Sequence, residues 1–515
     1  MTLRVLRPTA AQAYATSLSF RILAAAFLIL LPGFSTAASA APYSLPKFSG
    51  LAAKNIDATA LVVDLTSGRV LAQHNPDLRL TPASVSKLFI DAAALEYWGP
   101  GHRFYTRLYS NGPVVNGVLQ GDLLLKGGGD PELTANRLWL LVMRLKQMGI
   151  RSVSGNLIIN DSLFGTVPCD NKDRCEAIAA ANNGYDAPLS SAGLGYSAVE
   201  ITVFPGSKVG EKARIEVLPP GLAEFDIEGT IDTVLARNRP LYGVRRVTKD
   251  GREVLSAYGR VPVGGGPYRL YRSVSDPARH TGHVLLAMLK DSDIRVQGRL
   301  QVSSTEVPKD FNSLDMVQSL ELSQILRSMM TFSNNYMADV LTLGIAARDN
   351  RTGNLTLPVA SQKLEDLSRR ANLGAPDWLR AKSTTEPSGI LKGGSGLNPA
   401  NKLSARDIVA LMSRMHDNAE LFPSFVSTLS IPEHVSSRML RRWANKDWKT
   451  RIAVKTGYLS EPRSAIGVGG YFRLKNGGWG AFACIANGTQ KRRNLSSSEA
   501  IGSCREDMQK ILAQI

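Results

Sequence analysis

The order of strand-like and helix-like segments along the 515 residues limits the possible folds more than any other feature. Two short β-type runs, 61–63 and 69–71, lie on either side of a Thr-Ser-Gly turn. Three further β-type runs lie near the other end, at 451–454, 465–474 and 479–486. Helix-like segments lie between the two sets. We therefore expect an α+β domain in which both ends of the chain build one antiparallel sheet with helices on its faces.

The helical segments are predicted from apolar spacing and from one capping signal. Segments 84–97, 320–330, 335–347 and 506–515 have this spacing. In the first of them, Leu88, Ala92 and Leu95 fall on one helical face. A further helix is expected to begin at Ser404, because Ser404 and Asp407 have the spacing of a capping box.

The middle of the chain has a different pattern. Across 107–317, short β-type runs alternate with Gly, Pro and Asn turns, and one helix is expected over 138–146. We interpret this region as two mostly-β domains inserted into a single domain. That domain would then be split into residues 41–106 and 318–515.

Residues 1–40 have the composition of an export signal. Three arginines and no acidic residue accompany an apolar run at 22–31, and small residues lead up to Ala40. A membrane-spanning helix needs about 20 apolar residues, so this run favours a cleaved signal peptide over an uncleaved anchor. We expect cleavage near Ala40, a periplasmic location and no stable membrane insertion afterwards.

Charge and cysteine content limit the partners, disulfides and cofactors that we expect. The formal net charge is +17, but the basic residues are dispersed along the chain, which argues against a nucleic-acid partner. Proximity favours disulfides between Cys169 and Cys175 and between Cys484 and Cys504, although four cysteines allow three pairings. Neither pair has C-x-x-C spacing and the six histidines are scattered, so we expect no metal and no cofactor.

Ser84 and Lys87 form an S-x-x-K element where the helix 84–97 begins. Positions i and i+3 share a helical face, so the lysine amine can approach the serine hydroxyl and act as its base. The first turn of a helix also offers free N–H groups for a developing oxyanion. Ser44 and Lys47 have the same spacing, so the pattern alone is weak. The alternative is a helix-capping serine beside a solvated lysine.

Two further polar elements follow in the sequence. Ser333 and Asn335 lie between two predicted helices, where they are either functional or simply turn residues. Lys455, Thr456 and Gly457 lie on a predicted strand, whose edge could hold a peptide carboxylate. The alternative for Lys455 is a solvated lysine on an ordinary strand.

Taken together and in this order, S-x-x-K, S-x-N and K-T-G resemble the signature of active-site serine penicillin-recognising enzymes. The long gap from Ser84 to Ser333 is similar to that of a narrower group. This is the D-alanyl-D-alanine carboxypeptidase/endopeptidase family of low-molecular-mass class C (type-4) penicillin-binding proteins, the S13 peptidases. Further matching stretches are 126–131, 160–164 and 394–397, so the resemblance covers residues 55–490. It implies a penicillin-binding, β-lactamase-like transpeptidase domain with an all-helical subdomain.

The resemblance implies a role for each motif residue. Ser84 would be acylated by the penultimate D-Ala of a peptidoglycan stem peptide, or by a β-lactam as a covalent inhibitor. Lys87 would be its base, and Ser333 would relay the proton to the leaving amine.

The other motif residues would bind the substrate. Asn335 would bind the substrate amide, Lys455 and Thr456 the terminal carboxylate, and the N–H groups of Ser84 and Tyr458 the oxyanion, next to Gly457. Asp161 would meet an amine of the stem peptide. A homodimer is also expected.

The sequence departs from the family pattern at three places. Asn334 replaces Asp in S-x-N, Gly393 replaces Asp before Gly-Ser-Gly-Leu with Asn398-Pro399 following, and Tyr458 replaces a small hydroxyl residue. Two alternatives to a DD-peptidase are a serine β-lactamase-like hydrolase and a weakly active wall-binding scaffold. The first needs a Glu followed four residues later by Asn, whereas Glu365 and Glu386 are followed by Arg369 and Ile390.

Overall fold

The computed structural model describes residues 41–515 apart from 219–221, 223, 251, 350–354 and 381–388. The predicted export signal and Glu386 therefore lie outside the described residues.

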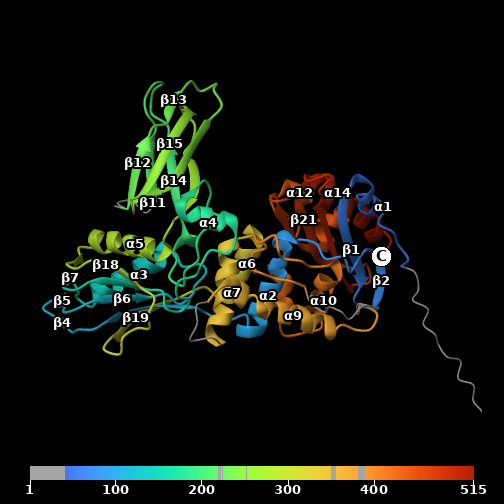
Figure 1. Ribbon diagram of the computed structural model, residues 1–515, viewed down its shortest axis with the longest axis horizontal. Coiled ribbons are helices and arrows are strands. Elements are labelled where there is room, and N and C mark those ends of the chain that lie inside the picture. Colours follow the sequence, from blue (N-terminus) through green and yellow to red (C-terminus); the bar gives the residue numbers. More distant parts are fainter. Residues whose placement is uncertain (1–40, 219–221, 223, 251, 350–354, 381–388) are drawn as a thin grey trace, which may run out of the picture. The chain divides into compact units, whose positions relative to one another are not determined.

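A five-stranded antiparallel sheet joins the two ends of the chain (Figure 1). Its order is β2 (Arg69–His74), β1 (Ile56–Asp64), β22 (Trp479–Gly488), β21 (Ala465–Arg473) and β20 (Ile452–Leu459). Ala60 of β1 lies opposite Cys484 of β22, although the two are distant in sequence. The sheet expected from both ends of the chain is confirmed, and β20 is left at its edge.

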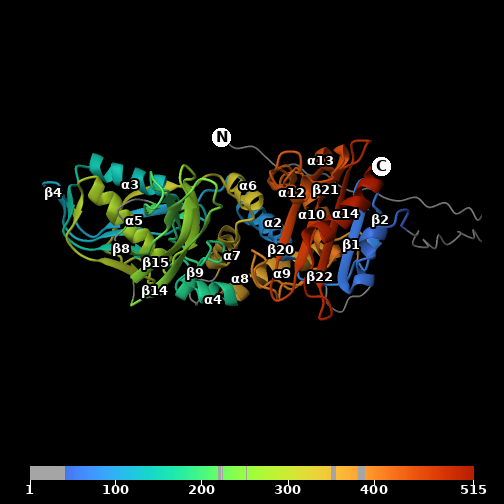
Figure 2. The ribbon, with the colours of Figure 1, turned by 90° about the horizontal axis from the view of Figure 1, so that it is seen from above.

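Both faces of this sheet are buried, because successive side chains of a strand point to opposite faces. Leu61 and Val63 of β1 belong to one hydrophobic cluster, whereas Ala60 and Val62 belong to a second. Figure 2 shows helices on both sides of the strands.

The first cluster packs against helices that include α2 (Lys87–Trp98), α6 (Leu322–Phe332), α7 (Asn335–Asp349), α9 (Gln362–Leu373), α10 (Ala405–His416) and α11 (Phe422–Thr428). The second packs against α1 (Pro46–Ser49), α12 (Arg438–Arg441), α13 (Lys446–Arg451) and α14 (Ser497–Leu512).

Local sequence explains how two of the helices against the first cluster begin. The predicted capping box is present at α10, where the Ser404 side chain accepts from the Asp407 N–H and the Asp407 side chain accepts from the Ser404 N–H. The segment that contains Ser84 is not a plain α-helix. A 3₁₀ turn, η2 (Ala83–Ser86), comes first, and α2 begins only at Lys87.

In the described part of the middle of the chain, the strands form four further sheets. One contains β18 (Leu300–Ser303), β8 (Leu157–Asn160), β6 (Leu123–Lys126), β3 (Tyr105–Ser110) and β19 (Asn312–Gln318). A second contains β17 (Arg295–Val296), β7 (Ser152–Val153), β5 (Val118–Leu119) and β4 (Val114–Val115). A third contains β11 (Arg214–Leu218), β10 (Ala198–Phe204) and β16 (Tyr268–Ser273). The fourth contains β12 (Phe225–Gly229), β15 (Arg252–Pro262), β14 (Leu241–Lys249) and β9 (Ala180–Ala181), with β13 (Asp232–Val234) on β15.

These sheets surround two separate hydrophobic clusters. One includes Leu141 and Leu285, and the other includes Ile201 and Leu255. The division of the insert into two domains, together with its boundaries, stays a prediction.

Among its described residues, the insert contains three α-helices, of which only one was expected. The expected one is α3 (Ala135–Gln147), and the others are α4 (Lys172–Ala179) and α5 (Pro277–Asp291). The signal for α5 was present in the sequence, because Asp276 caps its N-terminus and Pro277 occupies its first turn.

Asp91, in the middle of α2, is a buried carboxyl group that affects stability. Its side chain is fully buried and accepts a hydrogen bond from the Thr428 hydroxyl. Burial raises the pKa of Asp91 from 3.8 to about 8. Between these two values the folded protein keeps a proton that the unfolded chain has lost, so the free energy of unfolding falls as the pH rises.

We expect Asp91→Asn to remove this part of the pH dependence. At pH 9 the free energy of unfolding of the variant should exceed that of wild type by about 1 kcal/mol or more. This difference should disappear toward pH 4. Denaturant titrations at several pH values measure the difference. A constant difference across pH 4–9 would show that Asp91 does not titrate in this window.

Candidate active site

Ser84 and Lys87 meet at the junction between η2 and α2. The Lys87 Nζ lies 3.0 Å from the Ser84 Oγ. The lysine side chain is fully buried, whereas the serine is partly exposed. The sequence-predicted approach of amine and hydroxyl across one turn is therefore present in the geometry.

Two carbonyl oxygens complete the surroundings of the Lys87 amine. Its Nζ donates to the Asn335 Oδ1 at 2.7 Å and to the Ser395 backbone oxygen at 2.5 Å. A neutral amine has two N–H donors and one lone pair. The two carbonyls accept the two donors, which leaves the lone pair for the proton of the Ser84 hydroxyl. The hydrogen-bond set therefore fits a neutral lysine that acts as a base.

Ser333 and Asn335 line one cavity, at the turn between α6 and α7. Ser333 follows α6 in the left-handed conformation (φ 53°), and Asn335 is the first residue of α7. The Asn335 amide donates to the Tyr185 backbone oxygen at 3.3 Å, while its oxygen accepts from Lys87. Asn335 thus bridges the inserted region and the S-x-x-K element.

Lys455 reaches the S-x-N element from the sheet edge. Its side chain is buried on β20, and its Nζ donates to the Ser333 Oγ at 2.9 Å and to the Thr456 backbone oxygen at 2.7 Å. The structure therefore brings Ser84, Lys87, Ser333, Asn335 and Lys455 into one connected site.

Gly457 allows β20 to lie directly against η2. A Cβ atom at Gly457 would lie 2.7 Å from the Pro82 oxygen and 2.8 Å from the Ser84 nitrogen. Only a glycine lets the strand come this close, and the approach places the backbone of β20 beside the N–H of Ser84. Tyr458, the next residue, has a side chain that is 55% exposed, so its bulk points away from this contact.

Burial disfavours the protonated form of both lysines in the site, and the charge of Lys455 adds to this effect at Lys87. Burial and then the positive charge of Lys455 lower the pKa of Lys87 well below its usual value, against the opposing effect of Asp339. Burial lowers the pKa of Lys455 to about 7. The site therefore favours the neutral form of Lys87.

Sequence reasoning missed the group that fixes the backbone of Ser395, whose carbonyl accepts from Lys87. The Asp339 Oδ1 accepts from the Ser395 N–H at 2.9 Å. A Cβ at Gly393 would lie 3.2 Å from this same carboxylate oxygen. A side chain at position 393 would therefore press against the Asp339 carboxylate, which gives a physical account of the Gly393 departure. The available signal was spacing, because Asp339 follows Asn335 by four residues on one helix.

Asp161 has a structural environment. It is buried, and its oxygens accept from the Ser190 hydroxyl at 2.8 Å and from the Ser191 hydroxyl and N–H at 2.5 and 2.8 Å. Its carboxylate therefore fixes residues 190–191, and this arrangement gives no support to a contact with a substrate amine.

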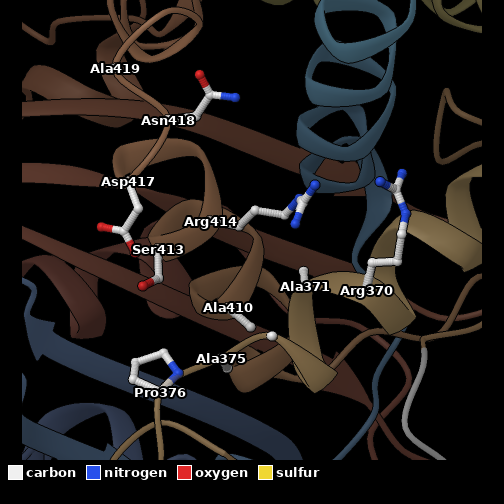
Figure 3. A pocket seen from close by; sticks show the side chains of 11 residues that line it. Arg370, Ala371, Ala375, Pro376, Ala410, Ser413, Arg414, Asp417, Asn418 and Ala419 are labelled. Atoms are coloured by element: carbon white, nitrogen blue, oxygen red, sulfur yellow. The ribbon is translucent and has the colours of Figure 1, made fainter. Parts of the chain in front are cut away.

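Two cavities of similar size lie in different places. The first, about 480 Å³, is lined by Arg370 and Arg414 (Figure 3). Both of these guanidinium groups pair with Glu96. None of the predicted site residues lines this cavity. The second, about 500 Å³, is lined by Ser333 and Asn335. Aromatic residues also line it, among them Tyr185 of the insert and Phe332 of the segment 318–515. The second cavity therefore adjoins the site.

The cysteines pair as proximity favoured, Cys169 with Cys175 and Cys484 with Cys504. Within the described part of the chain, no group of three or more His, Cys, Asp or Glu side chains is arranged to hold a metal ion.

We expect Gly457→Ala to disable Ser84 without unfolding the protein, because the added methyl group pushes β20 away from the Ser84 N–H. Acylation of Ser84 by labelled penicillin should slow by about 100-fold or more. Gly469→Ala is the matched control, since Gly469 lies opposite Lys455 on β21 and its Cβ would meet nothing closer than 3.3 Å. Equal acylation rates in the two variants would contradict the proposed role of the close approach.

Comparisons with known proteins agree on one family. The sequence profile of the D-Ala-D-Ala carboxypeptidase 3 (S13) family matches residues 51–508. A D-alanyl-D-alanine carboxypeptidase of Actinomadura sp. (strain R39) is 26% identical over 462 residues, which is 86% of this chain and 79% of the relative.

Solved structures give the same fold. The crystal structure of penicillin-binding protein 4 from Haemophilus influenzae has a TM-score of 0.70 at 20% identity, over 89% of this chain and 97% of the other. The same protein complexed with a novel β-lactam has a TM-score of 0.68 at 20% identity and the same coverage. The predicted fold class is thereby confirmed. The chain belongs to the D-Ala-D-Ala carboxypeptidase 3 (S13) family, as its three motifs predicted.

Proposed function

We propose that the protein is a serine DD-peptidase that removes the terminal D-Ala from D-Ala-D-Ala ends of peptidoglycan stem peptides. One observation carries this proposal. A buried lysine amine lies 3.0 Å from a partly exposed serine hydroxyl, and its two N–H donors are already used by carbonyl oxygens. Family membership supports the same activity.

In the proposed reaction, the Ser84 Oγ attacks the carbonyl carbon of the penultimate D-Ala while neutral Lys87 takes the hydroxyl proton. The N–H groups of Ser84 and Tyr458 stabilise the oxyanion. Collapse of the intermediate breaks the amide bond, and the leaving amine receives a proton through Ser333. Water then hydrolyses the acyl-enzyme.

Lys455 and Thr456 bind the substrate's terminal carboxylate in this proposal. A protonated Lys455 at the edge strand provides the positive charge, and a substrate strand can add its backbone to β20. Penicillins carry a carboxylate beside a reactive amide, so they would acylate the same serine. A related structure contains a β-lactam, which is in keeping with this expectation.

We also propose endopeptidase action on D-Ala–diamino acid cross-bridges. A cross-linked substrate brings a second stem peptide to the site and needs more room than a terminal D-Ala. The cavity of about 500 Å³ beside Ser333 and Asn335 offers such room, and it is lined by residues of the insert and of the catalytic region.

The place of action proposed is the periplasm, where these substrates occur. The composition of residues 1–40 supports export. Over the described ranges, no helix has the length and apolar character needed to span a bilayer. The homodimer stays a prediction.

A β-lactamase-like hydrolase has less support. Glu365, the described one of the two candidate water-activating residues, accepts from the Leu391 N–H and pairs with Lys392. Its carboxylate is therefore engaged away from Ser84 and Lys87.

The first test compares two serines with the same sequence spacing to a lysine. Ser84→Ala should lower D-Ala release from a pentapeptide by at least about a thousandfold and abolish the penicillin adduct, because the nucleophile is missing. Ser44→Ala removes an exposed serine of the other S-x-x-K element and should retain wild-type rates. Equal D-Ala release by wild type and Ser84→Ala would exclude Ser84, and no release by either would favour the scaffold alternative.

The second test uses pH. kcat/KM reports the free enzyme, so it should decline above pH about 7 as Lys455 loses its proton and its hold on a substrate carboxylate. A substrate whose terminal carboxylate is amidated should lack this decline, although its rates are lower throughout. Fixed-time assays at pH 5–10 measure the pH dependence of kcat/KM for both substrates. Identical profiles would contradict the role of Lys455 in binding the carboxylate.

A further inference from the structure

We infer that Arg174 of the inserted region is a positioning residue for Lys87, because it holds the buried carboxylate of Asp339 that fixes the Ser395 carbonyl against the lysine amine. The inference rests on the proposed role of Lys87 as the base for Ser84. It assigns the insert a part in the chemistry beyond walling the site.

A continuous chain of contacts leads from Arg174 to Lys87. The Arg174 Nη2 donates to the Asp339 Oδ2 at 2.8 Å, and the Asp339 Oδ1 accepts from the Ser395 N–H at 2.9 Å. The Ser395 carbonyl in turn accepts from the Lys87 Nζ at 2.5 Å. The side chains of Arg174 and Asp339 are each only 1% exposed, so water cannot replace these contacts.

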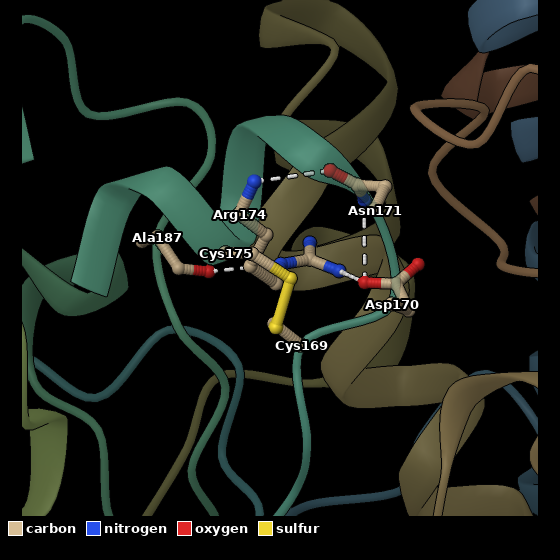
Figure 4. Close-up of a disulfide and its surroundings, with 6 residues drawn as sticks. All are labelled: Cys169, Asp170, Asn171, Arg174, Cys175 and Ala187. Atoms are coloured by element: carbon tan, nitrogen blue, oxygen red, sulfur yellow. Dashed lines mark hydrogen bonds and ion pairs between the residues drawn. A yellow bond between two sulfur atoms is a disulfide. The ribbon is translucent and has the colours of Figure 1, made fainter. Parts of the chain in front are cut away.

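The guanidinium of Arg174 is held on the insert side as well. It donates to Asp170 and, through its Nε, to the Ala187 backbone oxygen at 3.1 Å (Figure 4). Asn171 caps α4 by accepting from the Arg174 N–H at 3.0 Å. The Cys169–Cys175 disulfide closes the short segment that contains Arg174, Asp170 and Asn171. This small covalent loop therefore presents one arginine to a helix of the catalytic region.

The charges around Lys87 give Arg174 a second effect. Lys455 on β20, Asp339 on α7 and Arg174 on α4 all act on the amine, and Asp170 pairs with Arg174. Asp339 raises the pKa of Lys87, whereas burial, Lys455 and Arg174 lower it. Without Arg174, the buried charge of Asp339 would be uncompensated and would favour a protonated Lys87, which cannot accept a proton from Ser84.

The neutral state of Lys87 and the position of the Ser395 carbonyl that accepts from it thus both depend on the ion pair between Arg174 and Asp339. Arg174 and Asp339 are 165 residues apart in the sequence. This pair links the insert to the base of the catalytic region. A buried ion pair that loses one partner leaves the other charge unpaired, so the two residues should be strongly coupled energetically.

The test measures the second-order rate constant of penicillin acylation from pH 4 to 10 for wild type and variants. In Arg174→Gln, the rising limb of the profile should move to higher pH by about one unit, with about tenfold slower acylation at neutral pH. In Asp339→Asn, the rising limb should move to lower pH. The double variant should have a limb close to that of wild type, because the two opposing charges are removed together. Arg174→Lys should restore part of the Arg174→Gln shift.

Arg406→Gln is the control for removal of a buried, ion-paired arginine. Its side chain is 10% exposed and pairs with Asp77, and its charge does not act on Lys87. This variant should keep the wild-type limb even if its stability falls.

An Arg174→Gln profile that is lowered equally at every pH would overturn the inference, since a purely structural role predicts that result. If Arg174→Gln does not fold, Asp339→Asn decides the matter, because Arg174 keeps Asp170 as a partner in that variant. An unmoved limb in Asp339→Asn would also overturn the inference. Failure of wild type to be acylated would instead refute the proposed function.

Discussion

The site depends on one buried nitrogen atom, the Nζ of Lys87. A charged ammonium in a fully buried position is strongly disfavoured, so the surrounding groups must suit a neutral amine. They come from separate segments of the chain, namely the η2 turn with Ser84, the start of α7 with Asn335 and the 394–397 segment with Ser395. Because the amine is satisfied only when all three are present, the catalytic region has to close around Lys87 before Ser84 has a base.

The split sheet makes this closure possible. β1 and β2 come from one end of the chain, and β20, β21 and β22 come from the other. Pairing of β1 with β22 brings the S-x-x-K helix, which follows β2, toward the strand that carries Lys455 and Gly457. The final contact is made by Gly457 against the Ser84 nitrogen, where no side chain fits. The inserted region therefore lengthens the chain between the motifs without separating them in space.

Residues whose partners lie close in the sequence could be predicted more readily than residues whose partners lie far away. Ser84 and Lys87 were predictable because they are three residues apart at a helix start, and the capping box at Ser404 was predictable for the same reason. The α5 helix was missed although Asp276 and Pro277 mark its beginning, because the surrounding β-type runs dominated the interpretation. Asp161 was expected at the substrate, yet its carboxylate binds Ser190 and Ser191. Hydrogen-bond partners of this kind leave no periodic pattern.

The sequence by itself determined the family, the three motifs and the joining of both chain ends in one sheet, because these depend on short spacings and on the order of segments. Only the tertiary structure decided which groups surround Lys87. The contacts of Arg174 with Asp339 and of Ser395 with Lys87 join residues 165 and 308 positions apart. Burial supplies the remaining constraint, since it lowers the pKa of Lys87 and of Lys455, and burial exists only once segments distant in the sequence have packed together.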